Sequence, residues 1–191
     1  MASLIVGLGN PGGEYRGTRH NVGWMALDEL EARGRFGRER REGPAKVREG
    51  AIDGYDLVTA RPQTYMNISG RAAVHLLRKY GVPAGDLIVV HDDVDLPLGR
   101  IRLKRGGGAA GQKGVLSIAD ALRTQEFVRV RIGVSRPLDR DQMVDYVLDR
   151  FTPDEREQLA TVIPRAADAV MTLVRSGLEN AMSEYNRAPD D

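Results

Sequence analysis

A histidine in a polar loop is the residue of this chain that its type and surroundings best suit to catalysis. His20 falls in the stretch from Gly9 to Asn21, which is too rich in glycine, proline and polar residues for regular structure. A neutral imidazole accepts a proton from water near neutral pH, so His20 is a candidate general base. A lone loop histidine also fits a residue without a chemical role. His75, in a helical segment, is expected to be structural or exposed, and His91, which ends an apolar run, to be a satisfied core group.

A cluster of acids, Asp92, Asp93 and Asp95, follows the apolar run 87–91. That run has the pattern of a buried strand, and carboxylates at its carboxyl end would point into the crevice where α/β proteins bind ligands. One of these acids could orient His20 and stabilise its imidazolium. A magnesium site built from the same oxygens is an alternative, although no phosphate-transfer motif accompanies it. A solvated acidic turn before the next proline is a third interpretation.

Several other chemistries lack the residues they need. The chain has no cysteine, no Gly-x-Ser-x-Gly elbow and no pair of histidines at zinc spacing. The stretch Gly7 to Gly12 matches a dinucleotide-binding pattern, but Pro11 and further glycines stand where the helix of that motif would begin. If the chain is an enzyme, the simplest chemistry is attack by water that a histidine deprotonates.

Two features suggest anion binding. Residues 106–114 form a glycine-rich loop before a predicted helix; its backbone N–H groups could cradle an oxyanion or phosphate, or the loop is a flexible connection. The net charge is only +1, but cations crowd two segments: Arg33, Arg35, Arg38, Arg40, Arg41, Lys46 and Arg48, then Arg100, Arg102, Lys104 and Arg105. These runs are either solvated loops and edge strands or a phosphate-contacting surface, and acids that include Asp190 and Asp191 compensate their charge.

The elements that must position these residues alternate between strand and helix. Strands are predicted at 3–8, 46–52, 55–60, 87–91, 100–104 and 127–134, the second and third forming a hairpin around Asp53-Gly54. Helices are predicted at 22–33 with Asn21 as N-cap, at 66–80, from 114 to about 123, from 153 to about 175 with a kink or interruption at Pro164, and after Gly177. Residues 34–44 are predicted to be a basic linker. The alternation predicts an α/β fold with a mixed sheet in one domain, residues 1–191.

Nothing in the sequence indicates a membrane or export. No apolar stretch approaches the roughly 20 residues that a membrane helix needs. The N-terminus lacks the basic and apolar regions of a signal peptide. The expected location is the cytoplasm.

Four regions of the sequence together resemble the bacterial peptidyl-tRNA hydrolase family. They are Val6-Gly7-Leu8-Gly9-Asn10-Pro11-Gly12 with Glu14-Tyr15 and Thr18-Arg19-His20-Asn21; Pro62-Gln63-Thr64-Tyr65-Met66-Asn67-Ile68-Ser69-Gly70; His91-Asp92-Asp93-Val94-Asp95-Leu96-Pro97-Leu98-Gly99; and Arg129-Val130-Arg131-Ile132-Gly133. They occur in the family's order and spacing, and the resemblance runs from the first predicted strand to the last helix. It implies a single twisted mixed sheet with helices packed around it.

The resemblance implies a carboxylic ester hydrolase that cuts peptides from tRNA with no metal or cofactor. His20 would be the general base, Asp92 would hold its ring, and Asn10 would contact the substrate near the peptide. The other implied contacts are to tRNA: Tyr15, Tyr65 and Asn67 at its 3′ end, and Lys104 and Arg131 at its 5′-phosphate. The expected partner is peptidyl-tRNA, and the protein is expected to be a monomer with no membrane or obligate protein partner. A catalytically weak RNA-binding protein on the same fold is the alternative.

The glycine-rich loop departs from the family pattern. Family members usually end this loop in Gly-His-Asn-Gly, whereas this chain has Gly111-Gln112-Lys113-Gly114. Lys113 stands where an asparagine would contact the tRNA acceptor end, and a lysine there could bind a phosphate. This altered pair motivates the RNA-binding alternative, while the intact His20 and Asp92 favour the enzyme.

Overall fold

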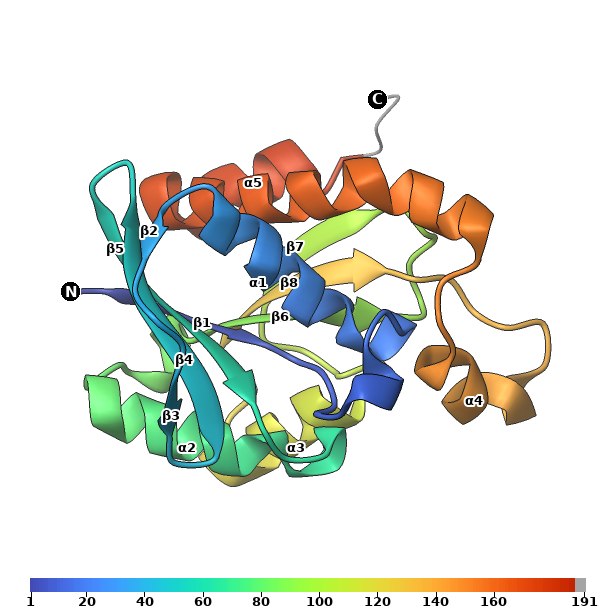
Figure 1. The fold of residues 1–191 in the computed structure, drawn as a ribbon, viewed down its shortest axis with the longest axis horizontal. Helices are drawn as coiled ribbons and strands as arrows, with labels where there is room; N and C mark the ends of the chain where they lie inside the picture. Colours follow the sequence, from blue (N-terminus) through green and yellow to red (C-terminus); the bar gives the residue numbers. More distant parts are fainter. Residues whose placement is uncertain (188–191) are drawn as a thin grey trace.

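Eight strands form one mixed sheet in residues 1–187, the part of the chain that the computed structural model describes (Figure 1). They are β1 (Ser3–Gly7), β2 (Arg35–Phe36), β3 (Arg40–Glu42), β4 (Ala45–Ile52), β5 (Tyr55–Pro62), β6 (Ile88–Asp93), β7 (Ile101–Arg105) and β8 (Val128–Gly133). Their order in the sheet is β2-β4-β5-β1-β6-β8-β7, and β3 also pairs with β4. The predicted α/β fold with a mixed sheet is confirmed.

The four central strands are parallel, and this determines where a site can form. β1 lies between β5 and β6, and β8 lies on the other side of β6. On the two flanks, β4 and β7 pair antiparallel with β5 and β8. Because parallel strands have their carboxyl ends at one edge of a sheet, the segments after β1 and β5 meet the end of β6 there. These segments carry Asn10, Tyr65 and Asp92.

Within the described residues, the faces of the sheet are covered by helices α1 (Val22–Ala32), α2 (Ser69–Tyr80), α3 (Lys113–Leu122) and α5 (Pro153–Tyr185), and the short helix α4 spans Met143–Leu148. α1 and α5 lie over one face and α2 and α3 over the other (Figure 1). Alternation along each strand separates two buried cores, so that Val90 packs in the same core as Leu27 while its neighbour Val89 packs with Leu76. α4 stands apart, beyond the sheet edge to which the loop of residues 8–21 also runs (Figure 1).

Two local backbone features make this arrangement possible. Asp53 and Gly54 have φ values of 50° and 85°, the positive pair that a two-residue hairpin turn requires, so the predicted hairpin of β4 and β5 is confirmed. On α1, a Cβ atom at Gly23 would lie 2.4 Å from the carbonyl oxygen of Val90. Only glycine lets the first turn of α1 rest directly on β6, and this contact brings the preceding loop, with His20, over the strand ends.

The structure corrects two predictions and adds an element. Residues 34–44 are not simply a linker, because β2 and β3 form there and pair with β4. Helix α5 continues through Pro164, since packing of the long helix against α1 and the sheet outweighs the lost hydrogen bond. The break comes at Gly177 (φ 81°, ψ 172°), where a new helix was predicted. The sequence did not predict α4.

Four of the seven cations in the first basic segment form ion pairs with carboxylates. The ion pairs are Arg33 with Glu29 and Asp168, Arg40 with Glu49, Lys46 with Glu39, and Arg48 with Glu31. These contacts favour the interpretation of a solvated edge over that of a phosphate-binding surface. The compensating Asp190 and Asp191 lie outside the described residues. Within residues 1–187, no helix has the length and apolar character needed to cross a membrane.

Candidate active site

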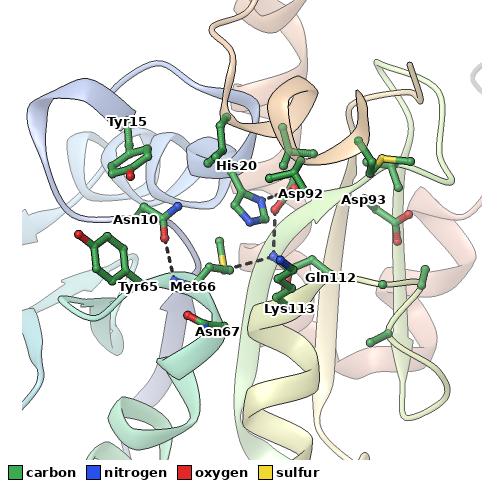
Figure 2. Close-up of a pocket in the computed structure, with 18 of the residues that line it drawn as sticks. Asn10, Tyr15, His20, Tyr65, Met66, Asn67, Asp92, Asp93, Gln112 and Lys113 are labelled. Atoms are coloured by element: carbon green, nitrogen blue, oxygen red, sulfur yellow. Dashed lines mark hydrogen bonds and ion pairs between the residues drawn. The ribbon is translucent and has the colours of Figure 1, made fainter. Parts of the chain in front are cut away.

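A cavity of about 430 Å³ opens at the carboxyl ends of the parallel strands. Polar side chains from separate segments meet in it, among them Asn10, His20, Asp92 and Gln112 (Figure 2). Val94 and the α4 residues Met143, Val147 and Leu148 form an apolar wall, while Met66 lies between Asn10 and Gln112. The combination of convergent polar groups and an apolar wall is typical of a small-molecule or peptide site.

His20 and Asp92 form a buried pair in this cavity. The Nδ1 atom of His20 lies 2.8 Å from Oδ2 of Asp92, and the two residues are 7% and 2% exposed (Figure 2). Because an ionised carboxylate can only accept, Nδ1 must carry the proton of this hydrogen bond. The lone pair of a neutral imidazole is then on Nε2, which has no hydrogen-bond partner among residues 1–187. The pair is therefore arranged so that Nε2 can take a proton from a bound water.

Gln112 binds the second oxygen of the same carboxylate. Its Nε2 donates to Oδ1 of Asp92 at 3.0 Å and contacts Sδ of Met66 at 3.4 Å (Figure 2). Its Oε1 accepts the backbone N–H of Val115 at 2.8 Å and so caps the N-terminus of α3. The neighbouring Lys113 is exposed on the first turn of α3 and lines the cavity. Sequence reasoning noted Gln112 only as a departure and did not predict its contact with Asp92.

Asn10 is fixed by two contacts that leave its amide nitrogen available. Its Oδ1 accepts the backbone N–H of Met66 at 2.7 Å. Asn21 holds the Asn10 backbone from the other side, donating to its carbonyl at 3.0 Å and accepting its N–H at 2.9 Å. Asn21 occupies the N-cap position of α1, as predicted, but its side chain makes no capping hydrogen bond because it is used to close the loop. Nδ2 of Asn10 has no partner among the described residues, in a side chain that lines the cavity.

The remaining predicted 3′-end residues surround the cavity. Tyr15 and Tyr65 lie on one side of it, near Asn10 (Figure 2). The Tyr65 side chain is largely exposed, which suits a ring that stacks on an unpaired base. Asn67 is also exposed and lies at the first turn before α2. All three residues line the cavity, and their contact with the 3′ end of tRNA stays a prediction.

Lys104 and Arg131 lie outside the cavity on the neighbouring strands β7 and β8. Arg131 donates from Nε to Oδ2 of Asp93 at 2.7 Å, and Nζ of Lys104 donates to the Gly108 carbonyl at 3.2 Å. Burial, followed by repulsion from Arg129 and Arg131, lowers the pKa of Lys104. A bound anion would relieve that repulsion, so the electrostatics suit a phosphate next to this pair.

Arg129 anchors the glycine-rich loop. Arg129 is 1% exposed, and its guanidinium donates to the backbone carbonyls of Gly106, Gly107 and Gly108. The loop predicted to be either an anion cradle or a flexible connection is thus held in place by a buried cation on β8. The C-terminal end of this loop places Gln112 and Lys113 at the cavity.

The three carboxylates of the acidic cluster bind different partners. Asp92 binds His20 and Gln112, Asp93 binds Arg131, and Asp95 binds Arg136 through Nε at 2.8 Å. The carboxylates therefore do not converge on one point. No group of three or more metal-ligating side chains occurs in residues 1–187, so the magnesium alternative finds no ligand set there.

The other two histidines have different surroundings. Nε2 of His75 lies 3.0 Å from a carboxylate oxygen of Glu42, at a partly exposed position. His91 is buried, as expected, and its Nδ1 donates to the Asp92 carbonyl at 2.7 Å. The expectation that His91 is fully satisfied is wrong, because its Nε2 has no partner within the described chain. Burial lowers the pKa of His91, which keeps the ring neutral without one.

Arg19 joins the His20 loop to the apolar wall, a role that sequence reasoning missed. Its guanidinium lies 4.1 Å from the centre of the Tyr146 ring, donates to the Tyr146 carbonyl at 2.9 Å and pairs with Glu155 at 2.7 Å. The hydrogen bonds from Thr152 and Arg19 overcome the effect of burial and lower the pKa of Glu155. One part of this arrangement had a signal in the sequence: Thr152 followed three residues later by Glu155 is a helix capping box, which places Glu155 in the first turn of α5.

Comparison with known proteins agrees with this geometry. The sequence model of the family described as peptidyl-tRNA hydrolase matches residues 4–191. This chain belongs to the peptidyl-tRNA hydrolase family. Among named family members, those of Mycobacterium avium and Nocardia farcinica are 48% and 46% identical to it, each over 96% of both chains. The crystal structure of peptidyl-tRNA hydrolase from Acinetobacter baumannii matches with a TM-score of 0.90 at 33% identity, covering 97% of this chain and 94% of that one.

Proposed function

We propose that this protein hydrolyses the ester that joins a peptide to tRNA, with His20 as general base. The observation that carries the proposal is the buried hydrogen bond of 2.8 Å between His20 and Asp92, with Nε2 of the ring facing the cavity and unpartnered within residues 1–187. Family membership gives the substrate class, since the relatives bear the name peptidyl-tRNA hydrolase. A binder would have no use for a base held by a carboxylate.

The reaction follows from the positions of the side chains. Nε2 of His20 takes a proton from water as the oxygen attacks the ester carbonyl, and Asp92 stabilises the imidazolium that forms. Nδ2 of Asn10 donates to the developing oxyanion. The imidazolium then returns its proton to the ribose oxygen as the carbon–oxygen bond breaks. The products are a free peptide acid and tRNA with its terminal hydroxyl restored.

The residues around His20 provide separate binding surfaces for the peptide and for the tRNA. The apolar wall formed by Val94 and α4 accepts the peptide, and Tyr15, Tyr65, Asn67 and Lys113 receive the 3′ end of the tRNA. Lys104 and Arg131 bind its 5′-phosphate. An aminoacyl-tRNA with a free, charged α-amine reacts poorly because the cavity would desolvate that charge without pairing it. The enzyme acts as a cytoplasmic monomer, in the compartment where translation forms its substrate.

The test is a turnover assay on an N-acetylated aminoacyl-tRNA. We expect His20→Ala to lower kcat by about 10²–10⁴-fold, the usual contribution of a general base. His75→Ala is the matched control and retains the parental rate, because His75 lies on α2 away from the cavity. Parental binding of tRNA without turnover would support the RNA-binding alternative. An unchanged rate in His20→Ala would refute the assigned base.

A further inference from the structure

We propose that Gln112 is a positioning residue that holds Asp92 in the orientation His20 needs. The inference rests on the proposed function and concerns the residue at which this chain departs from its family. Asp92 is a buried carboxylate whose two oxygens have different partners, His20 on Oδ2 and Gln112 on Oδ1. With only one of these contacts, the carboxylate could turn about its own bond. With both, its plane is fixed.

The orientation of the Gln112 amide is determined by its surroundings. Its Oε1 lies 2.8 Å from the backbone nitrogen of Val115, a group that can only donate. The amide nitrogen must therefore face Asp92, where a carboxylate can only accept. Gln112 is 7% exposed and also touches Met66, so water has little access to replace either contact. Helix α3, through its first turn, thus determines the direction of the donor.

Family members usually have a histidine where this chain has Gln112, and the glutamine amide differs from an imidazole in one respect that matters for catalysis. A histidine titrates in the physiological range, so its charge next to Asp92 would change with pH. The glutamine amide keeps the same charge and the same donor at every pH at which the protein is folded. In this chain, the support of Asp92 is therefore independent of pH.

The distinguishing variant is Gln112→Asn. Asparagine is a preferred N-cap and keeps the bond to Val115, but it is one methylene shorter and does not reach Asp92. We expect kcat to fall about tenfold with KM unchanged, as for the loss of one hydrogen bond to a charged group. The thermal unfolding midpoint falls by several degrees as well, because an oxygen of a buried carboxylate loses its donor, so kcat is measured well below that midpoint. Gln125→Asn makes the same chemical change at an exposed position before β8 and leaves all three values at the parental level.

A second variant, Gln112→Glu, keeps both length and cap but turns the donor into an acceptor. At neutral pH the carboxylate of residue 112 then faces that of Asp92, in the place where Nε2 of Gln112 lies 3.0 Å from Oδ1 of Asp92. Lowering the pH adds a proton that the two groups share, which restores the hydrogen bond. We therefore expect the ratio of variant to parental kcat to rise as the pH falls. A purely structural role for Gln112 predicts a constant ratio.

The outcomes separate this proposal from the proposed function. Parental kcat in Gln112→Asn, or a loss of kcat that disappears when the rate is expressed per folded molecule, would overturn the positioning role. If the parent itself turns over no substrate, the proposed function fails, and the NMR signal of the His20 Nδ1 proton still tests the inference. We expect that signal to be sharp in the parent and broadened by solvent exchange in Gln112→Asn. An equally sharp signal in both proteins would refute the positioning role without any activity measurement.

Discussion

Replacing Asp92 with asparagine should abolish the base by reversing the His20 tautomer. Gln112 donates to Oδ1 of residue 92, so an asparagine there keeps its oxygen toward Gln112. Its NH₂ group then faces Nδ1 of His20 at the position where Oδ2 of Asp92 lies, 2.8 Å away. A donor at that place requires Nδ1 to accept. The proton moves to Nε2, which can no longer take one from water.

The size of the effect follows from this complete loss of the acceptor. Since Nε2 loses its lone pair rather than part of its basicity, the substitution removes all of the general-base contribution, about 10²–10⁴-fold in kcat. This corresponds to about 3–5 kcal/mol of transition-state stabilisation. The same substitution in the triad of a serine protease costs about 10⁴-fold for the same reason. We expect Asp92→Asn to match His20→Ala within about tenfold, with KM nearly unchanged.

Single-turnover hydrolysis of N-acetylaminoacyl-tRNA at saturating enzyme measures this step directly. Combining Asp92→Asn with Gln112→Glu provides the decisive comparison. A glutamate at 112 accepts from the asparagine NH₂, so the asparagine oxygen turns to His20 and restores the productive tautomer. The double variant should therefore be at least tenfold faster than Asp92→Asn alone. A double variant slower than Asp92→Asn, or parental activity in the single variant, would refute the tautomer argument.

Three further predictions concern the surroundings of the site. Arg19→Lys loses the planar contacts to Tyr146 and Glu155 and should lower stability by about 2 kcal/mol, or about 4–8 °C in Tm, by calorimetry. Glu155→Gln should reduce stability most at neutral pH. Burial raises the pKa of Glu155, but hydrogen bonds from Thr152 and Arg19 bring the pKa below its ordinary 4.5, so the ionised carboxylate stabilises the fold above pH 4.5 and this stabilisation is lost as the pH falls further. In urea unfolding, the difference in stability between parent and variant should be smaller at pH 3 than at pH 7, and a constant difference would contradict the prediction. Lys104→Ala should weaken tRNA binding and reduce its salt dependence by about one phosphate contact, whereas Lys79→Ala on α2 should change neither, and an unchanged salt slope in Lys104→Ala would remove that contact from the site.

The sequence predicted those parts of the fold that depend on local patterns. The hairpin turn at Asp53-Gly54 and the helix break at Gly177 follow from backbone preferences that few other residues share. Those signals are carried by a few adjacent residues, so they can be read without the tertiary structure. That an acid at the carboxyl end of the central strand could orient His20 was one of three interpretations open from the residues, and the choice of Asp92 came from the family resemblance.

The missed features depend on tertiary contacts. β2 and β3 lack an alternating apolar pattern and exist because β4 offers them hydrogen bonds. The side chain of Asn21 has the chemistry of a helix cap, but the Asn10 backbone competes for it successfully. The contact between Gln112 and Asp92 joins residues 20 positions apart, and no local pattern specifies it. The sequence indicated which residues could react, but not which neighbours hold them in place.

The contacts around Arg19 connect distant parts of the chain and bear on how the enzyme is made. Thr18 bridges to Arg150 and Arg19 pairs with Glu155, so the loop of the base is completed by residues synthesised more than a hundred positions later. During translation, the growing polypeptide is itself a peptide attached to tRNA. Until the segment up to Glu155 has left the ribosome, the wall of α4 is not anchored. A product released early by a stalled ribosome therefore lacks the finished apolar wall of the cavity.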